Sequence, residues 1–166
     1  EGIDTLLEAA VLEEGFDVVI VGDGAHLPAL KRRALQLGVE GRTHFVGKVP
    51  SKDAWKWYAA LDVFAVPRKD TEVCRTVTPL KPLMALALGV PVVGSDLPAI
   101  NEVTGNNLIT HVPEDPKSLV QAIERAGEAS SVEKQALRSW AKSRTWEVNG
   151  QKFKDLFDGR FLANKT

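Results

Sequence analysis

The 166-residue sequence has one cysteine, one methionine and three histidines. A single thiol, Cys74, excludes an internal disulfide and fits a reducing compartment. No apolar run approaches the ~20 residues that a membrane-spanning helix needs. The 21 basic and 22 acidic residues nearly cancel, so the composition gives no sign of a polyanion-binding surface. Nucleic acid is therefore not expected as a partner.

The residues that catalyse reactions in other enzymes are also sparse. His26, His44 and His111 fall on separate predicted elements without metal-ligand spacing, so no metal site is expected. Cys74 has no histidine near it in the sequence, and no serine lies in a nucleophile elbow. These absences indicate that the chain does not carry a complete catalytic set of its own.

Length and composition fit one ordinary globular domain. Hydrophobic residues make up 44% and charged residues 26% of the chain, as in soluble folded proteins. The sequence opens at Glu1-Gly2-Ile3-Asp4, without a methionine, and enters a helical pattern almost at once. We interpret it as a piece of a longer chain.

Short β-branched runs alternate with amphipathic segments along the sequence, which predicts a doubly wound parallel sheet with helices on both faces. Ligands of such sheets bind at the carboxyl ends of the strands. Strands are expected near residues 17–21, 43–46, 62–66, 91–94 and 107–111, all in one sheet. Helices are expected near 3–14 and 26–37, after a cap at Ser51, near 80–88 and 116–127, and from 132 onward.

Two loops after predicted strands have glycines. At Gly22-Asp23-Gly24 the missing side chains let backbone N–H groups approach an anion, although a plain tight turn explains the motif as well. The stretch Gly47-Lys48-Val49-Pro50 follows the next strand and fits a turn.

A third loop, from Pro67-Arg68 to Thr78-Pro79-Leu80-Lys81, is more informative. Thr78 is suited to cap the following helix and Pro79 to its first position, so the positive helix end points out of the sheet edge. Arg68 and Lys81 add the charge that a diphosphate needs, unless both are solvated surface residues. A lysine there opposes the helix dipole by roughly a few tenths of a kcal/mol, which favours an anionic partner.

The segments "VVIVGDGAHLPALKRRALQLGVEGRTHFVGKVP", "WYAALDVFAVPR", "VTPLKPLMALALGVPVVGSDLPAINEV" and "SRTW" occur in this order and at a familiar spacing. Together they resemble the C-terminal, donor-binding domain of retaining GT-B-fold glycosyltransferases, the large group-one family, over about residues 1 to 150. The resemblance implies that residues 1–166 form a single Rossmann-like domain that binds a nucleotide sugar. It also implies that the family's first strand and its N-terminal acceptor domain lie upstream of this sequence.

The resemblance implies a donor linked to UDP or GDP, no cofactor and no metal. The diphosphate would lie at the glycine turn and the helix start, beside the two basic residues, with the base near the Val49-Pro50 turn. The implied donor-binding residues are Gly22, Gly24, Val49, Pro50, Arg68, Thr76, Thr78, Pro79, Leu80, Lys81 and Met84. The family's chemistry is front-face transfer with retention, which works by positioning and charge stabilisation, with catalytic residues expected mainly in the missing domain.

Met84 departs from the family, whose members have a glutamate there that holds the ribose hydroxyls. The usual acidic partner eight positions earlier falls on Thr76, and the lysine of many relatives falls on Glu1. Losing one charged hydrogen bond would weaken donor binding by on the order of 1.5–3 kcal/mol, or about 10- to 150-fold. Helical periodicity predicts a core face with Met84 at its margin, near the site. That face consists of Leu80, Leu83, Ala87 and Leu88.

Two functions are consistent with these residues. The first is the donor-binding half of a cytoplasmic glycosyltransferase that is inactive as an isolated fragment. Its acceptor would be a sugar, lipid or polysaccharide, and its missing half would contact the inner face of a membrane. The alternative is a degenerate, non-catalytic GT-B domain that serves assembly or partner binding. A dinucleotide dehydrogenase is disfavoured because the Gly22-Asp23-Gly24 turn lacks the third glycine of that fingerprint.

Overall fold

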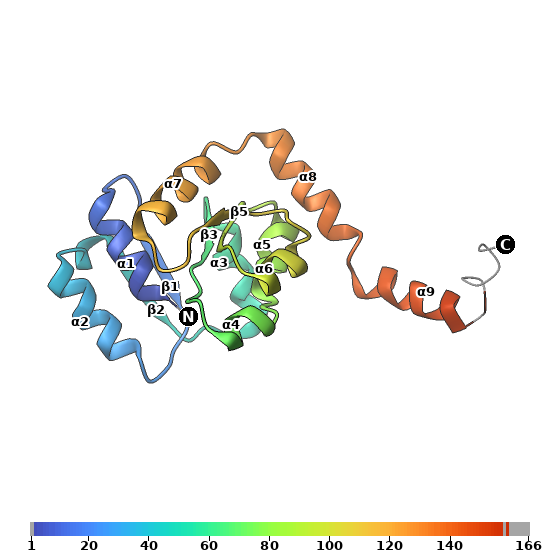
Figure 1. Cartoon of the computed structure of the whole chain (residues 1–166), viewed down its shortest axis with the longest axis horizontal. Coiled ribbons are helices and arrows are strands. Elements are labelled where there is room, and N and C mark those ends of the chain that lie inside the picture. Colours follow the sequence, from blue (N-terminus) through green and yellow to red (C-terminus); the bar gives the residue numbers. More distant parts are fainter. Residues whose placement is uncertain (1, 158, 160–166) are drawn as a thin grey trace.

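The computed structural model describes residues 2–157 and residue 159 (Figure 1). The strands are β1 (Val18–Val21), β2 (Thr43–Gly47), β3 (Phe64–Val66), β4 (Val92–Ser95) and β5 (Ile109–His111). The helices are α1 (Ile3–Leu12), α2 (Leu27–Leu37), α3 (Ala54–Ala59), α4 (Glu72–Thr76), α5 (Lys81–Leu88), α6 (Pro98–Thr104), α7 (Pro116–Gly127), α8 (Ser131–Lys142) and α9 (Trp146–Phe157). Two 3-10 turns, η1 (Glu40–Arg42) and η2 (Ser51–Asp53), precede β2 and α3.

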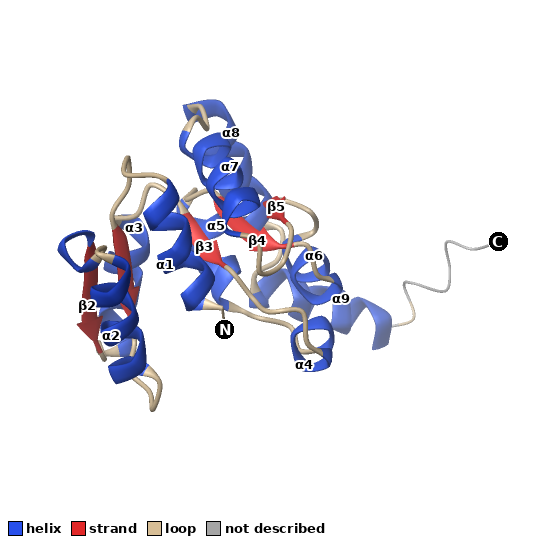
Figure 2. Ribbon diagram, turned by 60° about the vertical axis from the view of Figure 1, so that its left-hand side comes forward, coloured by secondary structure: helices blue, strands red, loops and turns tan. Residues whose placement is uncertain are grey.

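The strands form two parallel sheets, whereas the sequence predicted one. β1 pairs with β2 in the first sheet, and the second has the order β3-β4-β5. Figure 2 shows the two groups of strands apart from each other. The division has a simple cause, since no strand of the described residues lies between β1 and β3 to link them. The predicted α/β class with parallel strands is confirmed.

Helices cover both faces of the second sheet, as expected for a doubly wound fold. The alternation along β4 shows this directly, because Val92 and its neighbour Val93 enter different apolar clusters. Val92 packs with residues of α5 and α6, and with α3 and α8 around them. Val93 packs with α1 and α7 on the opposite side. The first sheet is covered by α1 and α2.

Helix α1 connects the two sheets, and it lies between them in Figure 2. Leu7 and Ala10 pack in the cluster of β1 and α2, whereas Ala9 packs in the cluster of β4 and α7. An ion pair of 2.6 Å between Asp4 and Lys69 ties the start of α1 to the segment after β3. Partial burial alone would raise the pKa of Asp4, but the hydrogen bond and charge of Lys69 outweigh it and lower that pKa.

Helix α5 begins later than the sequence predicted. Leu80 is its N-cap and Pro82 lies in its first turn, so Thr78 and Pro79 precede the helix. Pro79 and Pro82 both suit a helix start, and the fold uses the second. The predicted core face is also wrong, because Leu80 is 71% exposed and Ala87 is exposed. The buried residues of α5 are Pro82, Ala85 and Leu86, and the last two pack in the cluster that contains Val92 of β4.

Other boundaries differ in smaller ways. Ser51 opens the 3-10 turn η2, and Asp53 is the N-cap of α3, so the predicted cap at Ser51 is wrong. Helices α4 and α6 are short segments that the sequence patterns did not reveal. Helix α9 extends away from the sheets beyond α8 (Figure 1). Among the described helices, none is long and apolar enough to cross a membrane.

Gly2 allows α1 to begin against the end of β3. It is buried, its φ is 81°, and a Cβ atom built there would overlap the carbonyl oxygen of Pro67. We therefore expect Gly2→Ala to destabilise the protein by about 2 kcal/mol or more, through both the left-handed backbone and the overlap. Urea unfolding measures this loss. Gly41→Ala is the control, since nothing lies within 4 Å of a Cβ atom there. Equal stability of the two variants would contradict this account of Gly2.

Candidate functional site

A groove of about 1280 Å³ runs between β1 and β3. Its walls include every residue of both strands, and side chains of α1, α3 and α7 complete it. Where the strands end, the groove reaches Gly22 after β1, Lys48 after β2 and Arg68 after β3. The segment of residues 77–81, which leads into α5, lines the same groove. The fold thus brings three strand ends and one helix start to one opening, which we call the groove mouth.

Charge is distributed unevenly along the groove. Carboxylates lie where the strands begin, with Asp17 just before β1 and Asp62 just before β3. At the groove mouth the charged lining residues are Lys48, Arg68 and Lys81, all of them basic. Fixed charges of one sign at the end of a cleft attract a ligand of the opposite sign. The groove mouth is therefore suited to an anion.

The structure brings together seven of the predicted donor-binding residues. The predicted residues that line the groove are Gly22, Val49, Arg68, Thr78, Pro79, Leu80 and Lys81. Gly24, Pro50, Thr76 and Met84 lie outside its lining. Lys48 is a lining residue that the sequence reasoning did not select, although it stands next to Val49 in a loop that was examined. Its charge in a strand-end loop was the available signal.

The amides of both glycines in the turn after β1 already have acceptors within the protein. The N–H of Gly22 donates to the carbonyl of Gly47 at 2.9 Å, and that of Gly24 donates to its neighbour Asp23 at 2.7 Å. Gly22 has a φ of 145°, which disfavours any residue with a side chain, and the space around it is open. Gly22 therefore contributes room and backbone shape at the groove mouth.

Arg68 is buried beneath the loop, with only 7% of its surface exposed. Its Nη1 donates to the carbonyl oxygen of Val77 at 2.6 Å, so the guanidinium holds the segment that precedes α5. The carbonyl of Arg68 accepts a hydrogen bond of 2.6 Å from the hydroxyl of Ser95 on β4. The Arg68 side chain thus positions the loop that precedes α5, and its positive charge lies directly below that loop.

A buried histidine supports this arrangement from β5. Nδ1 of His111 donates to the carbonyl oxygen of Val112 at 2.8 Å, and Nε2 lies 3.2 Å from Oγ of Ser95. Burial lowers the pKa of His111, because the charged ring would lose its hydration, and it outweighs the hydrogen bond to Val112 and the charge of Asp115, which act in the opposite direction. His111 and Ser95 together fix the backbone from which Arg68 projects.

Thr76 and Met84 lie near the loop without entering the groove. The hydroxyl of Thr76 donates to the carbonyl of Glu72 within the short helix α4, at 2.8 Å. Met84 is 45% exposed on α5, which agrees with the predicted position at the margin of the core. A charged residue at position 84 would consequently remain in contact with water.

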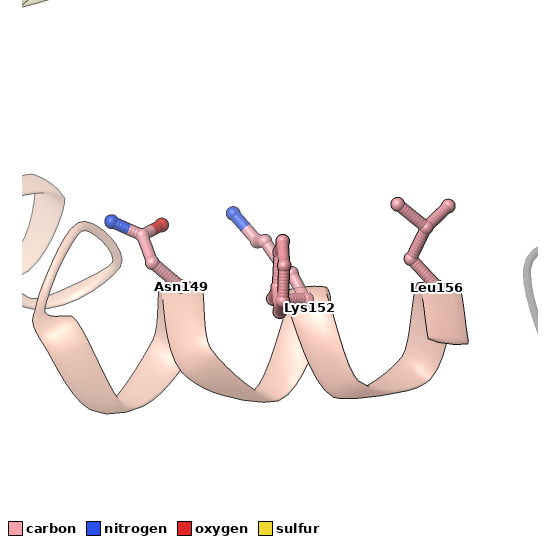
Figure 3. Close-up of a pocket in the computed structure, with 4 residues that line it drawn as sticks. Asn149, Lys152 and Leu156 are labelled. Atoms are coloured by element: carbon pink, nitrogen blue, oxygen red, sulfur yellow. The ribbon is translucent and has the colours of Figure 1, made fainter. Parts of the chain in front are cut away.

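A metal site and a second ligand pocket have less structural support than the groove. The described residues contain no group of three histidine, cysteine, aspartate or glutamate side chains that could hold a metal ion. A hollow of about 540 Å³ runs along α9, lined by Asn149, Lys152, Phe153 and Leu156 (Figure 3). All four residues come from one helix and lie on one side of it, so a second wall to enclose a ligand is missing from that lining.

Comparison with known proteins identifies the family. A family model described as "Glycosyl transferases group 1" matches residues 1–128, which is most of the chain. The chain belongs to the group 1 glycosyl transferases. The basic groove mouth at the ends of parallel strands is the candidate site of this group 1 chain.

Two curated relatives of this chain are named as sugar transferases. The lipopolysaccharide core biosynthesis mannosyltransferase LpsB of Rhizobium meliloti (strain 1021) is 32% identical over 72% of this chain and 35% of that protein. The O-antigen biosynthesis glycosyltransferase WclY of Escherichia coli is 23% identical over 99% of this chain and 40% of that protein. This group 1 chain therefore spans only about a third to two fifths of the length of these relatives.

A solved structure shows the same fold. Anabaena Alr3699/HepE, crystallised with UDP and glucose, superimposes with a TM-score of 0.73 over 95% of this chain and 45% of that one, at 22% identity. The structural neighbours are GT-B glycosyltransferases with Rossmann-like domains. The predicted GT-B relationship of the fold is confirmed.

The lowered pKa of His111 predicts a pH-dependent stability. The unfolded chain, whose histidine titrates near the ordinary 6.5, binds a proton more readily than the folded chain does. Stability from this group is complete above about pH 6.5 and declines as the pH falls below that value. Urea unfolding at pH 8 and pH 5 measures the decline, which His111→Gln should largely remove. His26→Gln, at the exposed start of α2, should leave it intact. An undiminished decline in His111→Gln would contradict the assignment.

Proposed function

We propose that this chain is the nucleotide-sugar donor-binding half of a retaining glycosyltransferase. In this proposal residues 1–166 form one donor-binding domain, and an N-terminal domain of the longer protein binds the acceptor. The observation that carries the proposal is the convergence of Lys48, Arg68 and Lys81 at the carboxyl ends of parallel strands, in a chain of the group 1 family. No comparable support exists for a non-catalytic role in assembly.

The groove mouth offers a diphosphate two kinds of attraction. Lys81 is the first residue of α5, where the positive helix end also favours an anion. Without an anion, the positive charge of Lys81 is mildly repelled by the positive end of the helix dipole. A bound diphosphate would offset this repulsion. Arg68 adds charge from below while it holds Val77, the residue that starts the lining segment. The phosphates would therefore lie between Lys48 and Lys81, above Arg68.

The remainder of the donor would extend from there along the loops. We place the base near Val49 and Pro50, at the turn after β2, and the ribose toward Met84 and Thr76. Gly22, whose surroundings are open, leaves room for the sugar or the phosphates beside β1. UDP is a suitable first probe because HepE was crystallised with UDP and glucose, and GDP is the second because LpsB is named as a mannosyltransferase.

The proposed chemistry divides between the two halves of the longer protein. This half holds the donor and stabilises the charge that develops on the departing diphosphate, through Lys48, Arg68 and Lys81. Transfer occurs from the front face of the sugar with retention, without a metal ion or a base from this domain. The acceptor, a sugar, lipid or polysaccharide, and the catalytic residues belong to the rest of the protein. The transfer reaction would take place in the cytoplasm, and the N-terminal half of the longer protein would contact the inner face of a membrane.

Ligand-dependent hydrogen exchange tests the donor site. Millimolar UDP or GDP should slow exchange at residues 47–50 and 77–81, since these segments line the groove mouth. Lys81→Ala should weaken binding by about tenfold or more, the range for one charged hydrogen bond. Lys142→Ala, an exposed lysine at the end of α8, is the matched control and should bind as the parent does. Protection confined to another face, or equal binding by both variants, would remove the site. The isolated chain should show no transferase turnover.

Met84→Glu tests ribose recognition. A carboxylate there should accept a hydrogen bond from the ribose and tighten UDP or GDP binding by about tenfold or more. Because position 84 is 45% exposed, the new charge keeps its hydration, and the melting temperature should change little. Ala87→Glu places the same charge on an exposed position one turn further along α5. Calorimetric titration that finds no tightening, or the same tightening in Ala87→Glu, would exclude position 84 from the ribose site.

A further inference from the structure

One side of the groove mouth, formed by the segment that leads into α5, is apolar. Val77 and Leu80 line the groove and are 54% and 71% exposed. Met84 follows Leu80 by one helical turn and is 45% exposed. We call these three side chains the α5 wall. Apolar side chains that gather on a surface mark a place of contact, and this wall suits a part of the ligand that has few hydroxyl groups.

Hydrogen-bonding groups are sparse along the α5 wall. From Val77 to the end of α5, the side chains with strong hydrogen-bonding groups are those of Thr78 and Lys81. Lysine only donates, and the thioether of Met84 is a weak acceptor. The carbonyl oxygen of Val77 already accepts a hydrogen bond from Arg68 at 2.6 Å. The hydroxyl of Thr78 is therefore the one good side-chain acceptor that this segment offers to a ligand hydroxyl.

The carboxylates that precede this segment lie outside the groove lining. Asp70 accepts a hydrogen bond of 2.7 Å from Nη2 of Arg75, and Glu72 lies in the first turn of α4. Neither Asp70 nor Glu72 lines the groove, and the charged lining residues at its mouth are basic. The hydroxyl of Thr76 donates to the carbonyl oxygen of Glu72. A ligand hydroxyl at the α5 wall consequently meets no carboxylate of the groove lining.

The direction of the donor across the mouth follows from the proposed donor site, on which this inference rests. Lys81 and Met84 are three residues apart on one helix, so their side chains lie on the same side of α5. A diphosphate at Lys81 therefore has one of its two substituents beside Met84. The transferred sugar is rich in hydroxyls, and the open space at Gly22 suits it better than an apolar wall. The pentose of the nucleoside then lies against the α5 wall.

The two pentoses of natural nucleotides differ at this wall by one hydroxyl. A ribose 2′-hydroxyl that leaves water without gaining an acceptor weakens binding by roughly five- to 150-fold. In 2′-deoxyribose the same position is a methylene group, which gains dispersion contacts with Leu80 and Met84. Because Met84 remains 45% exposed, we expect the lower end of that range.

We propose that the donor of this chain is a 2′-deoxyribonucleoside diphosphate sugar, and that the α5 wall selects 2′-deoxyribose over ribose. Met84 is the residue that determines this specificity, since it occupies the wall with an apolar side chain where an acceptor would favour ribose. The inference adds the class of pentose to the proposed donor site. It applies to any base and to any transferred sugar.

Paired nucleotides that differ only in the 2′-hydroxyl test the proposal. In calorimetric titrations of the whole chain, dUDP should bind about fivefold or more tightly than UDP. The ratio of dGDP to GDP should be similar, because the wall contacts the pentose and not the base. Equal binding within each pair, or tighter binding of the ribonucleotides, would overturn the proposal and leave the donor site intact. Failure of all four nucleotides to bind would instead remove the donor site, and this inference with it.

Substitutions at position 84 test the assigned residue. Met84→Gln supplies an amide oxygen as acceptor at a similar length and without a charge, so it should favour UDP over dUDP by about threefold or more. Met84→Leu keeps the wall apolar and should retain the preference for dUDP. Ala87→Gln, with the same amide at an exposed position further along α5, should retain it too. If Met84→Gln changed the affinities for UDP and dUDP by the same factor, the 2′-position would not contact residue 84, and the proposal would be wrong.

Discussion

The packing of α1 against both sheets is the constraint on which the other features depend. The small residues Ala9 and Ala10 let one helix enter two apolar clusters, one around β1 and one around β4. The Asp4–Lys69 ion pair adds a polar tie at the end of the helix that faces the groove mouth. Because Lys48 follows a strand of one sheet and Arg68 follows a strand of the other, the geometry of the candidate site depends on the packing of α1 against both sheets.

The second constraint is the buried polar chain from His111 through Ser95 to Arg68. Burying a guanidinium is unfavourable unless its hydrogen bonds are made, and here the Val77 carbonyl makes one of them. The result is a loop that is rigid at its base and carries a positive charge beneath it. A side chain that projected into solvent would supply the same charge but would have to lose its freedom when an anion bound. Arg68 is ordered in advance by its contacts with the protein.

The sequence predicted local structure well and long-range structure less well. The five strands, the helix at residues 116–127 and the helix ends at Gly38 and Gly89 follow from β-branched runs, periodicity and C-cap chemistry. Which of two prolines starts α5 depends on which side chains of the helix enter the core, and this is a matter of tertiary packing. The burial of Arg68 beneath its loop depends on a carbonyl nine residues away. The division into two sheets depends on pairing between strands far apart in the sequence. Hydrophobic periodicity does not predict such pairing.

One groove combines two chemical environments, and the strand direction explains why they do not interfere. Along its length the walls consist mostly of apolar side chains of α1, α3 and the two strands, with carboxylates where the strands begin. At the groove mouth the strands end and loops form the lining, and the charged lining residues there are basic. Helix α1 begins at this carboxyl edge, directly after Gly2. The left-handed backbone of Gly2 brings the start of α1 against Pro67, next to Arg68, and so the apolar length of the groove ends where its basic mouth begins.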